Sequence, residues 1–208
     1  MNLFEALNWR YAVKRFSDDI IDEEEVKQLL NASRLSASAY GLQPYKLIVI
    51  KSKELRARLI PYSYGQEKVM QSSHLIVFAI HSSIGSETVD NYINKYEDVI
   101  KQPGKNFKLY VENIRSELAL MSPEEKVEWA HKQSHIALGN MLTCAALMKI
   151  DCCPMAGFDK SGYDRILKLK EKNLTASVIC PIGRRHNEDV YANQPKVRFD
   201  FKDIVIEM

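Results

Sequence analysis

The order of apolar and polar residues predicts two helices near the start of the chain. Residues 3–9 are amphipathic and predict a short first helix. Asp22 followed by Glu25 resembles a capping box, in which side chains at a helix start bind free backbone N–H groups. Helical spacing of apolar residues follows, so we expect a second helix over residues 23–34.

Three segments predict buried strands. Leu47–Ile50 and Leu75–Ile80 are continuous apolar runs, and a strand that is covered on both sides has no polar face. Thr175–Cys180, which ends before Pro181 and Gly183, is expected to be the third buried strand. Between the first two, Ser52 is placed to cap a short helix that ends before Pro61.

The middle of the chain is expected to be helical. Residues 86–121 are polar with a helical period that breaks at Pro103-Gly104, which predicts a helical hairpin. Ser122-Pro123-Glu124-Glu125 is a strong helix start, and this helix is expected to reach about Lys149. Its second half, Ile136–Leu147, is apolar or small on nearly all sides, which indicates a helix that is buried all round. A second subunit or the interior of a monomer would cover it, and we favour the subunit.

The last third of the chain adds one more helix and no second domain. After Asp151 the chain turns through Pro154 and Gly157, and a helix is expected over residues 161–169. Helical and strand segments are mixed along the chain, without an internal repeat or a linker-like segment. The sequence therefore predicts one α+β domain over residues 1–208, with a sheet flanked by helices.

Composition and charge exclude several classes of partner. The 208 residues include 29 basic and 27 acidic residues, and this balance gives no reason to expect a nucleic acid or a membrane surface. No apolar run approaches the ~20 residues that span a bilayer. The N-terminus lacks a basic segment followed by an apolar run, so we expect no signal peptide and a cytoplasmic location.

The four cysteines favour reduced thiols. Cys144, Cys152, Cys153 and Cys180 have neither a disulfide framework nor the spacing of zinc ligands. Free thiols are the simplest account in a cytosol. The adjacent pair Cys152-Cys153 is expected to be buried and inert.

Two features of the sequence would suit an anion. Lys196 and Arg198 are two residues apart, so in an extended segment they project to the same side. Arg can hold a phosphate through two parallel hydrogen bonds. The small-residue loop Ser36–Gly41 offers unobstructed backbone N–H groups. On the residues alone, a solvated cation pair and an ordinary surface loop are the favoured interpretations.

His131 and His135 share one face of the long helix, a spacing also found in zinc proteases. Lys132 stands where such an enzyme carries its glutamate base, and no third ligand is evident. We therefore predict no metal site and interpret both residues as surface or interface histidines.

A set of segments spread over nearly the whole chain resembles one known family. The segments are Arg10–Phe16, Ser36–Ser38 with Gln43–Tyr45, Ser72–Phe78, Trp129–Gln133 with Gly139-Asn140, Pro154–Asp159, Pro181–Gly183 and Lys196–Arg198. In this order they are similar to the FMN-dependent nitroreductases, and most similar to the branch of oxygen-insensitive NAD(P)H nitroreductases and dihydropteridine reductases.

This resemblance implies a three-layer α/β/α sandwich with a mixed, mainly antiparallel sheet. It also implies an entwined homodimer, in which long central helices pack across the interface and each FMN lies between two subunits. Residues 86–121 would form much of a helical lid over the substrate.

The resemblance assigns cofactor-binding positions in this chain. Arg10, Lys196 and Arg198 match ligands of the FMN phosphate, and Lys14 and Lys68 match lysines at the pyrimidine edge of the flavin. The other matched positions are Tyr11, Ala12, Ala37, Ser38, Ala39, Gly41, Gln66, Pro154, Ala156 and Gly157.

Some of these positions depart from the family pattern. Ala12 stands where a serine often contacts the cofactor, and Ala156 replaces a common glutamate. Gly41 and Gly65 replace asparagines, with Gln66 next to the second of them. The loop that holds Ser38 would meet the flavin of the partner subunit, and the backbone at residues 156–157 would approach flavin N5.

The resemblance implies no catalytic acid, base or nucleophile, because the flavin carries the chemistry. NADH or NADPH would donate a hydride and leave the cleft. A nitroaromatic, quinone or similar small electrophile would then be reduced in the same cleft, which is a ping-pong order.

Three other functions stay open at this point. The chain could be a specialised relative that removes halogen or modifies flavin or peptide heterocycles, or a flavin-binding protein without turnover. A metal hydrolase that uses His131 and His135 is the third. The reductase is favoured over all three, while the physiological acceptor and the choice between NADH and NADPH are not determined by the sequence.

Overall fold

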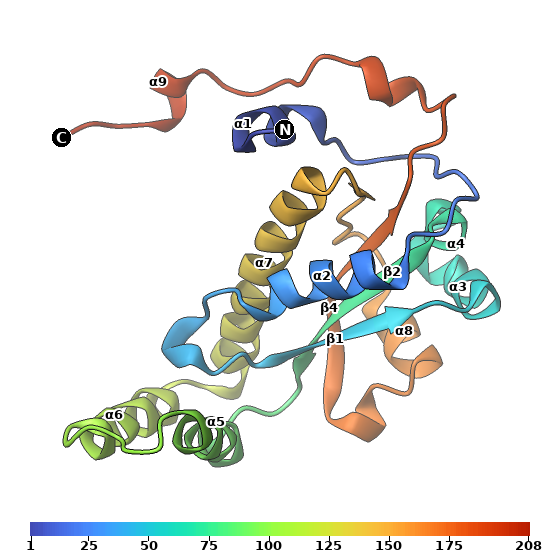
Figure 1. Ribbon diagram of the computed structural model, residues 1–208. Helices are drawn as coiled ribbons and strands as arrows, with labels where there is room; N and C mark the ends of the chain where they lie inside the picture. Colours follow the sequence, from blue (N-terminus) through green and yellow to red (C-terminus); the bar gives the residue numbers. More distant parts are fainter.

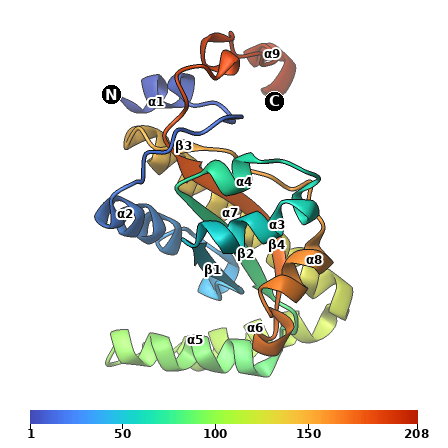
Figure 2. The same cartoon turned by 90° about the vertical axis from the view of Figure 1, so that its right-hand side faces the viewer.

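The computed structural model covers residues 1–208 and shows a four-stranded sheet between two layers of helices (Figures 1 and 2). The strands are β1 (Tyr45–Ile50), β2 (His74–His81), β3 (Asp151–Cys152) and β4 (Leu174–Gly183). They lie in the order β1-β2-β4-β3, and each neighbouring pair is antiparallel. A single isolated parallel bridge joins Ala12 to Cys152 beside β3, so the pairing is mainly antiparallel, as expected.

The chain forms nine α-helices. They are α1 (Leu3–Trp9), α2 (Glu23–Arg34), α3 (Lys53–Leu59), α4 (Lys68–Gln71), α5 (Ser86–Val99), α6 (Phe107–Leu120), α7 (Pro123–Leu147), α8 (Lys160–Ile166) and α9 (Phe201–Ile204). Four short 3₁₀ turns lie between them, η1 (Ala39–Gly41), η2 (Pro61–Ser63), η3 (Lys170–Lys172) and η4 (Val190–Asn193).

The helix starts follow the capping residues of the sequence. Ser122 and Glu125 form a complete capping box at the start of α7, and Ser52 caps α3. Asp22 caps α2 through the N–H of Glu24, but the expected box does not form. Its second member, Glu25, instead binds Arg184 at 2.8 Å, because the tertiary fold brings that guanidinium to it.

Alternate residues of the central strand β2 belong to two hydrophobic cores, one on each face of the sheet. Ile76, Phe78 and Ile80 of β2 face the layer that contains α2 and α7. Leu75 and Val77, which alternate with them, face the layer that contains α3, α4 and α8. This central strand is buried on both faces, as its unbroken apolar run predicts.

The first strand differs from its prediction. It begins at Tyr45 rather than Leu47, and residues 47–49 are only partly buried. The reason is its position at the edge of the sheet, where only β2 pairs with it. The apolar run predicts the strand correctly but cannot reveal the order of the strands.

The other helix predictions differ only at their ends. The hairpin over residues 86–121 is confirmed as α5 and α6, and the long helix ends at Leu147. The helix expected over residues 161–169 spans Lys160–Ile166, and Lys168 adopts a positive φ of 53° that ends it. No helix is both long and apolar enough to cross a membrane.

The two ends of the chain meet at one corner of the sandwich. Ser17 donates its N–H to the carbonyl of Arg184 at 2.8 Å, and His186 donates to the carbonyl of Arg15 at 2.9 Å. Beyond this ladder the C-terminal segment passes α1 and ends away from the sheet (Figure 1). Residues that are far apart in sequence are therefore neighbours at this corner.

Candidate functional site

A pocket of about 410 Å³ lies where the N-terminal and C-terminal segments meet. Its lining includes six residues that were predicted to bind the cofactor, namely Arg10, Tyr11, Ala12, Pro154, Lys196 and Arg198. Tyr191 and Gln194 also line the pocket and were not predicted. The structure therefore brings together residues from both ends of the chain that the sequence could connect only through a family resemblance.

The electrostatics of this corner pocket favour an anion. None of its lining residues is acidic. Burial, together with the charges of Arg10, Arg198 and Arg185, holds the pKa of Lys196 below its usual value. The Lys196 ammonium donates a hydrogen bond to the carbonyl of Arg10, and no carboxylate neutralises it. Cations gathered in this way are stabilised by a phosphate-sized anion.

The guanidinium of Arg185 stacks on two aromatic rings of the N-terminal segment, one of which, Tyr11, lines the corner pocket. The guanidinium carbon of Arg185 lies 4.1 Å from the ring centroid of Trp9 and 4.6 Å from that of Tyr11. The Arg185 side chain also donates to Asp151 at 2.9 and 2.7 Å, while its backbone N–H donates to the same carboxylate. Arg185 thus ties Trp9 and Tyr11 to the start of β3.

A second, polar pocket of about 280 Å³ holds the residues predicted for the pyrimidine edge. It is lined by Lys14, Arg15, Gln66, Glu67, Lys68 and Gln71. Lys68 is only 8% exposed, yet it forms no ion pair. A nearly buried lysine without a carboxylate partner is unusual. The side chain therefore has an unused donor facing a polar ligand site.

The two pockets are linked through one side chain. Lys14 lines the second pocket, and its ammonium lies 5.9 Å from the ring centroid of Tyr191 in the corner pocket. A ligand with a phosphate at one end and a polar ring edge at the other would have matching donors at both ends.

Four further predicted residues lie elsewhere in the chain, in the loop between α2 and β1. These are Ala37, Ser38, Ala39 and Gly41. The loop is held against α7, because Ala39 donates its N–H to Gln133 at 2.8 Å. None of the four lines either pocket. Their role at the partner's flavin stays a prediction, as does that of the exposed Ala156 and Gly157.

The helical hairpin α5–α6 carries an aromatic cluster next to this loop. Tyr92, Tyr96, Phe107 and Tyr110 line a pocket of about 520 Å³. The rings of Tyr96 and Phe107 are stacked, with centroids 4.1 Å apart. Tyr110 donates to the carbonyl of Tyr40 at 3.5 Å, which connects the hairpin to the α2–β1 loop.

Gly41 lies where the loop closely approaches the hairpin. Its φ is +74°, a region that residues with a side chain rarely adopt, and a Cβ there would lie 3.0 Å from the Tyr92 ring. The glycine that departs from the family pattern is therefore explained by the close approach of Tyr92.

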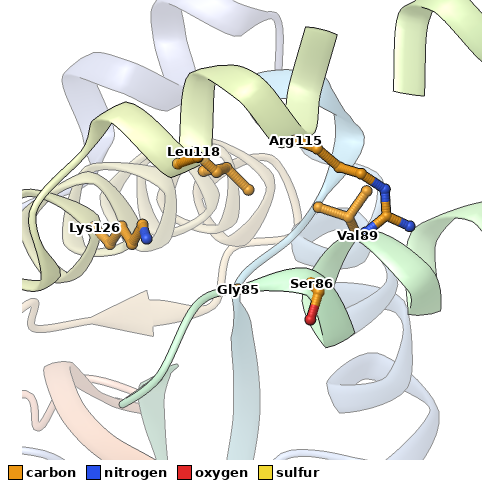
Figure 3. A pocket seen from close by; sticks show the side chains of 7 residues that line it. Gly85, Ser86, Val89, Arg115, Leu118 and Lys126 are labelled. Atoms are coloured by element: carbon orange, nitrogen blue, oxygen red, sulfur yellow. The ribbon is translucent and has the colours of Figure 1, made fainter. Parts of the chain in front are cut away.

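A different cavity, of about 260 Å³, lies between the hairpin and the start of α7 (Figure 3). Its lining residues are Gly85, Ser86, Val89, Arg115, Leu118, Ala119 and Lys126. No residue predicted to bind the cofactor is among them. Arg115 is paired with Asp90, so this cavity lies beside the ion pair that joins α5 to α6.

His131 belongs to a buried hydroxyl network rather than to the two pockets. A bulge in β4 leaves Ser177 outside the pairing with β2 and turns it toward α7. Ser177 Oγ lies 2.7 Å from His131 Nδ1 and 2.8 Å from Ser134 Oγ. His135 is more exposed and contacts only the carbonyl of His131 in this network. No group of three His, Cys, Asp or Glu side chains is arranged to hold a metal ion.

The His131 network predicts a dependence of stability on pH. Burial, with smaller contributions from the charges of Lys160 and His135, lowers the pKa of His131 to about 4. In the unfolded chain the imidazole titrates near ~6.5. Between these values the unfolded state binds more protons, so the free energy of unfolding decreases as the pH falls through this window.

We expect His131→Gln to weaken this dependence, because glutamine does not titrate. Urea unfolding between pH 7 and pH 4 should give a shallower decline for the variant than for the wild type. Parallel curves for the two proteins would contradict a neutral, half-buried His131.

The cysteines are all free, and Cys152 and Cys153 are buried, as predicted. Burial also raises the pKa of the Cys180 thiol, so this group stays protonated. The pair at residues 152–153 is therefore packed in the two cores rather than presented to a ligand.

The comparisons with known proteins agree with this architecture. A sequence model described as "Nitroreductase family" matches residues 7–184. Relatives named "putative NAD(P)H nitroreductase" include one from Staphylococcus saprophyticus, 32% identical over 98% of this chain and 95% of its own. Another, from Bacillus subtilis, is 29% identical over 98% of this chain and 96% of its own.

Solved structures give the same result for the fold. One is a "putative nitroreductase in complex with FMN" from Exiguobacterium sibiricum, with a TM-score of 0.85 and 21% sequence identity. The alignment covers 100% of this chain and 98% of the other. The sandwich thus has the nitroreductase fold. Because the family model spans most of the sequence, the chain belongs to the Nitroreductase family, which is a family of enzymes.

Proposed function

We propose that this protein is an FMN-dependent NAD(P)H oxidoreductase that reduces small electrophiles such as nitroaromatics and quinones in ping-pong order. The observation that carries the proposal is the convergence of Arg10, Lys196 and Arg198 on a pocket without any acidic lining residue. This corner pocket is joined, through Lys14 and Tyr191, to a second pocket, which contains the nearly buried Lys68 without an ion-pair partner.

The residues of the two pockets fit the two ends of FMN. Arg10, Lys196 and Arg198 would bind the phosphate, and Tyr11, Ala12 and Pro154 would form the surrounding wall. Lys14, Gln66 and Lys68 would donate to the pyrimidine edge. This assignment explains why Lys196 lies among other cations and why Lys68 is nearly buried without a counter-charge.

When bound, FMN would supply the two-electron chemistry, accepting a hydride from NAD(P)H and passing it to the acceptor. The chain contributes position and electrostatics. A cation at Lys14 favours negative charge at the neighbouring ring edge, so it makes reduction there more favourable. No side chain is assigned as a catalytic acid, base or nucleophile.

The aromatic cluster of α5 and α6 supports the proposal that the electron acceptors are planar molecules. Tyr92, Tyr96, Phe107 and Tyr110 line an open pocket, and aromatic side chains of this kind can stack on conjugated rings. Tyr110 contacts the loop that holds Ser38 and Gly41, which we assign to the partner's flavin. The hairpin would therefore lie over a flavin site that two subunits share.

A homodimer is part of the proposal. Along α7 the single chain leaves Ile136 49% exposed and Leu147 43% exposed. A Cβ at Gly139 would meet open space on the same helix. The C-terminal tail also exposes apolar side chains, among them Phe199 at 80%. Exposed apolar surface of this extent is typical of an interface, and light scattering should give twice the mass of one chain.

An anaerobic visible spectrum tests the function. The purified protein, supplied with FMN, should be yellow, and NADH or NADPH should bleach it. Benzoquinone or nitrobenzene should then restore the colour after the nicotinamide has been consumed. Initial rates at several fixed acceptor concentrations should give parallel double-reciprocal lines, as a ping-pong order requires.

Each possible outcome of this experiment distinguishes the proposed function from one alternative. A protein that takes up no FMN contradicts the proposal and the site residues with it. A yellow protein that neither nucleotide bleaches favours a flavin-binding protein without turnover. Intersecting lines would be compatible with a reductase but would contradict the ping-pong order.

A further inference from the structure

The carboxylate of Asp189 joins two segments that are far apart in the sequence. Asp189 is buried and immediately precedes the turn η4. One carboxylate oxygen accepts the backbone N–H groups of Lys14, at 2.8 Å, and Arg15, at 3.1 Å. The other oxygen accepts the N–H of Tyr191, also at 3.1 Å. A single side chain therefore connects the N-terminal segment to the C-terminal turn.

These contacts hold Lys14 at both of its ends. The Asp189 carboxylate binds its backbone, and the face of the Tyr191 ring lies 5.9 Å from its ammonium. Tyr191 is itself placed by Asp189, which caps the turn that carries the ring. The long and otherwise exposed Lys14 side chain has no carboxylate partner, so nothing else in the chain fixes its direction.

The carboxylate is charged at neutral pH. Burial alone would raise the pKa of Asp189, but the N–H donors of Lys14, Arg15 and Tyr191 hold that pKa below its usual value. The Tyr11 hydroxyl is buried beside it without a good hydrogen bond, and burial together with Asp189 raises the pKa of Tyr11. Charge-assisted hydrogen bonds of this kind are stronger than neutral ones, so the carboxylate is a firm anchor.

We propose that Asp189 and Tyr191 are positioning residues that fix Lys14 at the flavin edge and so set the reduction potential of the bound flavin. This inference rests on the proposed FMN-dependent function. A positive charge stabilises the anionic reduced ring only while it is held close, because the interaction weakens with distance and with hydration. Asp189 and Tyr191 favour the position of the lysine at the pocket over positions farther out in solvent.

The test is the midpoint potential of the FMN-loaded protein, measured by anaerobic spectroelectrochemical titration. Asp189→Asn cannot accept all three N–H bonds, because one oxygen becomes an amide group. We expect a more negative potential and a Kd for FMN that is about tenfold higher, since buried donors lose their acceptor. Tyr191→Leu keeps the backbone bonds and removes only the ring, so it should lower the potential with a smaller change in Kd.

Two further variants make the test specific. Glu24→Gln removes an exposed carboxylate of α2 that pairs with Lys27 and lines neither pocket. This control should leave the potential and the Kd unchanged. In a Lys14→Met background, neither Asp189→Asn nor Tyr191→Leu should shift the potential further, because both act through Lys14.

The outcomes distinguish this inference from the proposed function. A wild-type protein that binds no FMN refutes the function itself. If the wild type binds FMN, the inference is overturned when Tyr191→Leu leaves the potential unchanged. It is also overturned when Tyr191→Leu lowers the potential equally with and without Lys14. Tyr191 is exposed, so this variant gives a result even if Asp189→Asn fails to fold.

Discussion

A protein that carries both Lys196→Gln and Arg198→Gln is expected to lose most of its affinity for FMN. Both side chains line the corner pocket, which has no acidic residue. A hydrogen bond to a charged group contributes about 1.5–3 kcal/mol. Loss of two such bonds to a phosphate should therefore weaken binding by about 3–6 kcal/mol, or roughly a factor of 10² to 10⁴ in Kd.

The loss should extend beyond the two substituted residues. Lys196 also donates to the carbonyl of Arg10, so its removal frees the segment that presents the third cation. Residues in one network are not additive. Lys196→Gln alone should therefore lose more than half of the binding free energy that the pair contributes.

Quenching of flavin fluorescence would give the Kd of each protein. The matched control is Lys170→Gln with Lys172→Gln, which removes the same total charge from an exposed turn. Its Kd should stay within about twofold of the wild type, since charges beyond a Debye length are screened at ~0.15 M salt. Equal weakening by both double variants would mean that net charge, and not the pocket, governs binding.

Much of the fold follows from local patterns in the sequence. The caps at Ser52 and Ser122 and the break at Pro103-Gly104 place helix starts and a hairpin within one or two residues. The long-range order of the strands does not follow from such patterns. For that reason the edge position of β1 and the two-residue strand β3 were not predicted, although both help to close the sheet.

The site shows the same division between local and long-range information. Residues alone indicated only that Lys196 and Arg198 would project together, and the structure places both in one pocket. Their combination with Arg10 came from the family resemblance, because 186 positions separate Lys196 from Arg10. The loop at residues 37–41 lies apart from these cations in a single chain, so its proposed role depends on the second subunit.

The residues that were missed are those that act across the chain. Asp189 binds the backbone of Lys14, which is 175 positions away. Its only local signal is an Asp that precedes a short turn, which is a common capping arrangement. Arg185 and Asp151 give no local signal at all, since their pairing depends on the register of β3 and β4.

Replacement of Arg185 by methionine is expected to lower the free energy of unfolding by about 3–5 kcal/mol. Asp151 is 4% exposed and receives both side-chain hydrogen bonds of the Arg185 fork. Methionine would leave this carboxylate buried with only the backbone N–H of residue 185. It can still pack against the rings of Trp9 and Tyr11, so the loss should come mainly from the broken ion pair.

Urea unfolding of the protein without added FMN would measure the effect, and the midpoint should move without a large change in slope. The adjacent Arg184→Met is the matched control. Arg184 pairs with Glu25, but both side chains are about one third exposed, so we expect a loss of only about 0–1 kcal/mol. Arg185→Lys should fall between the two, since it keeps the charge and loses the two-pronged geometry. A loss for Arg185→Met no larger than that for Arg184→Met would show that Asp151 finds water or another donor, and that the ion pair does not hold this corner.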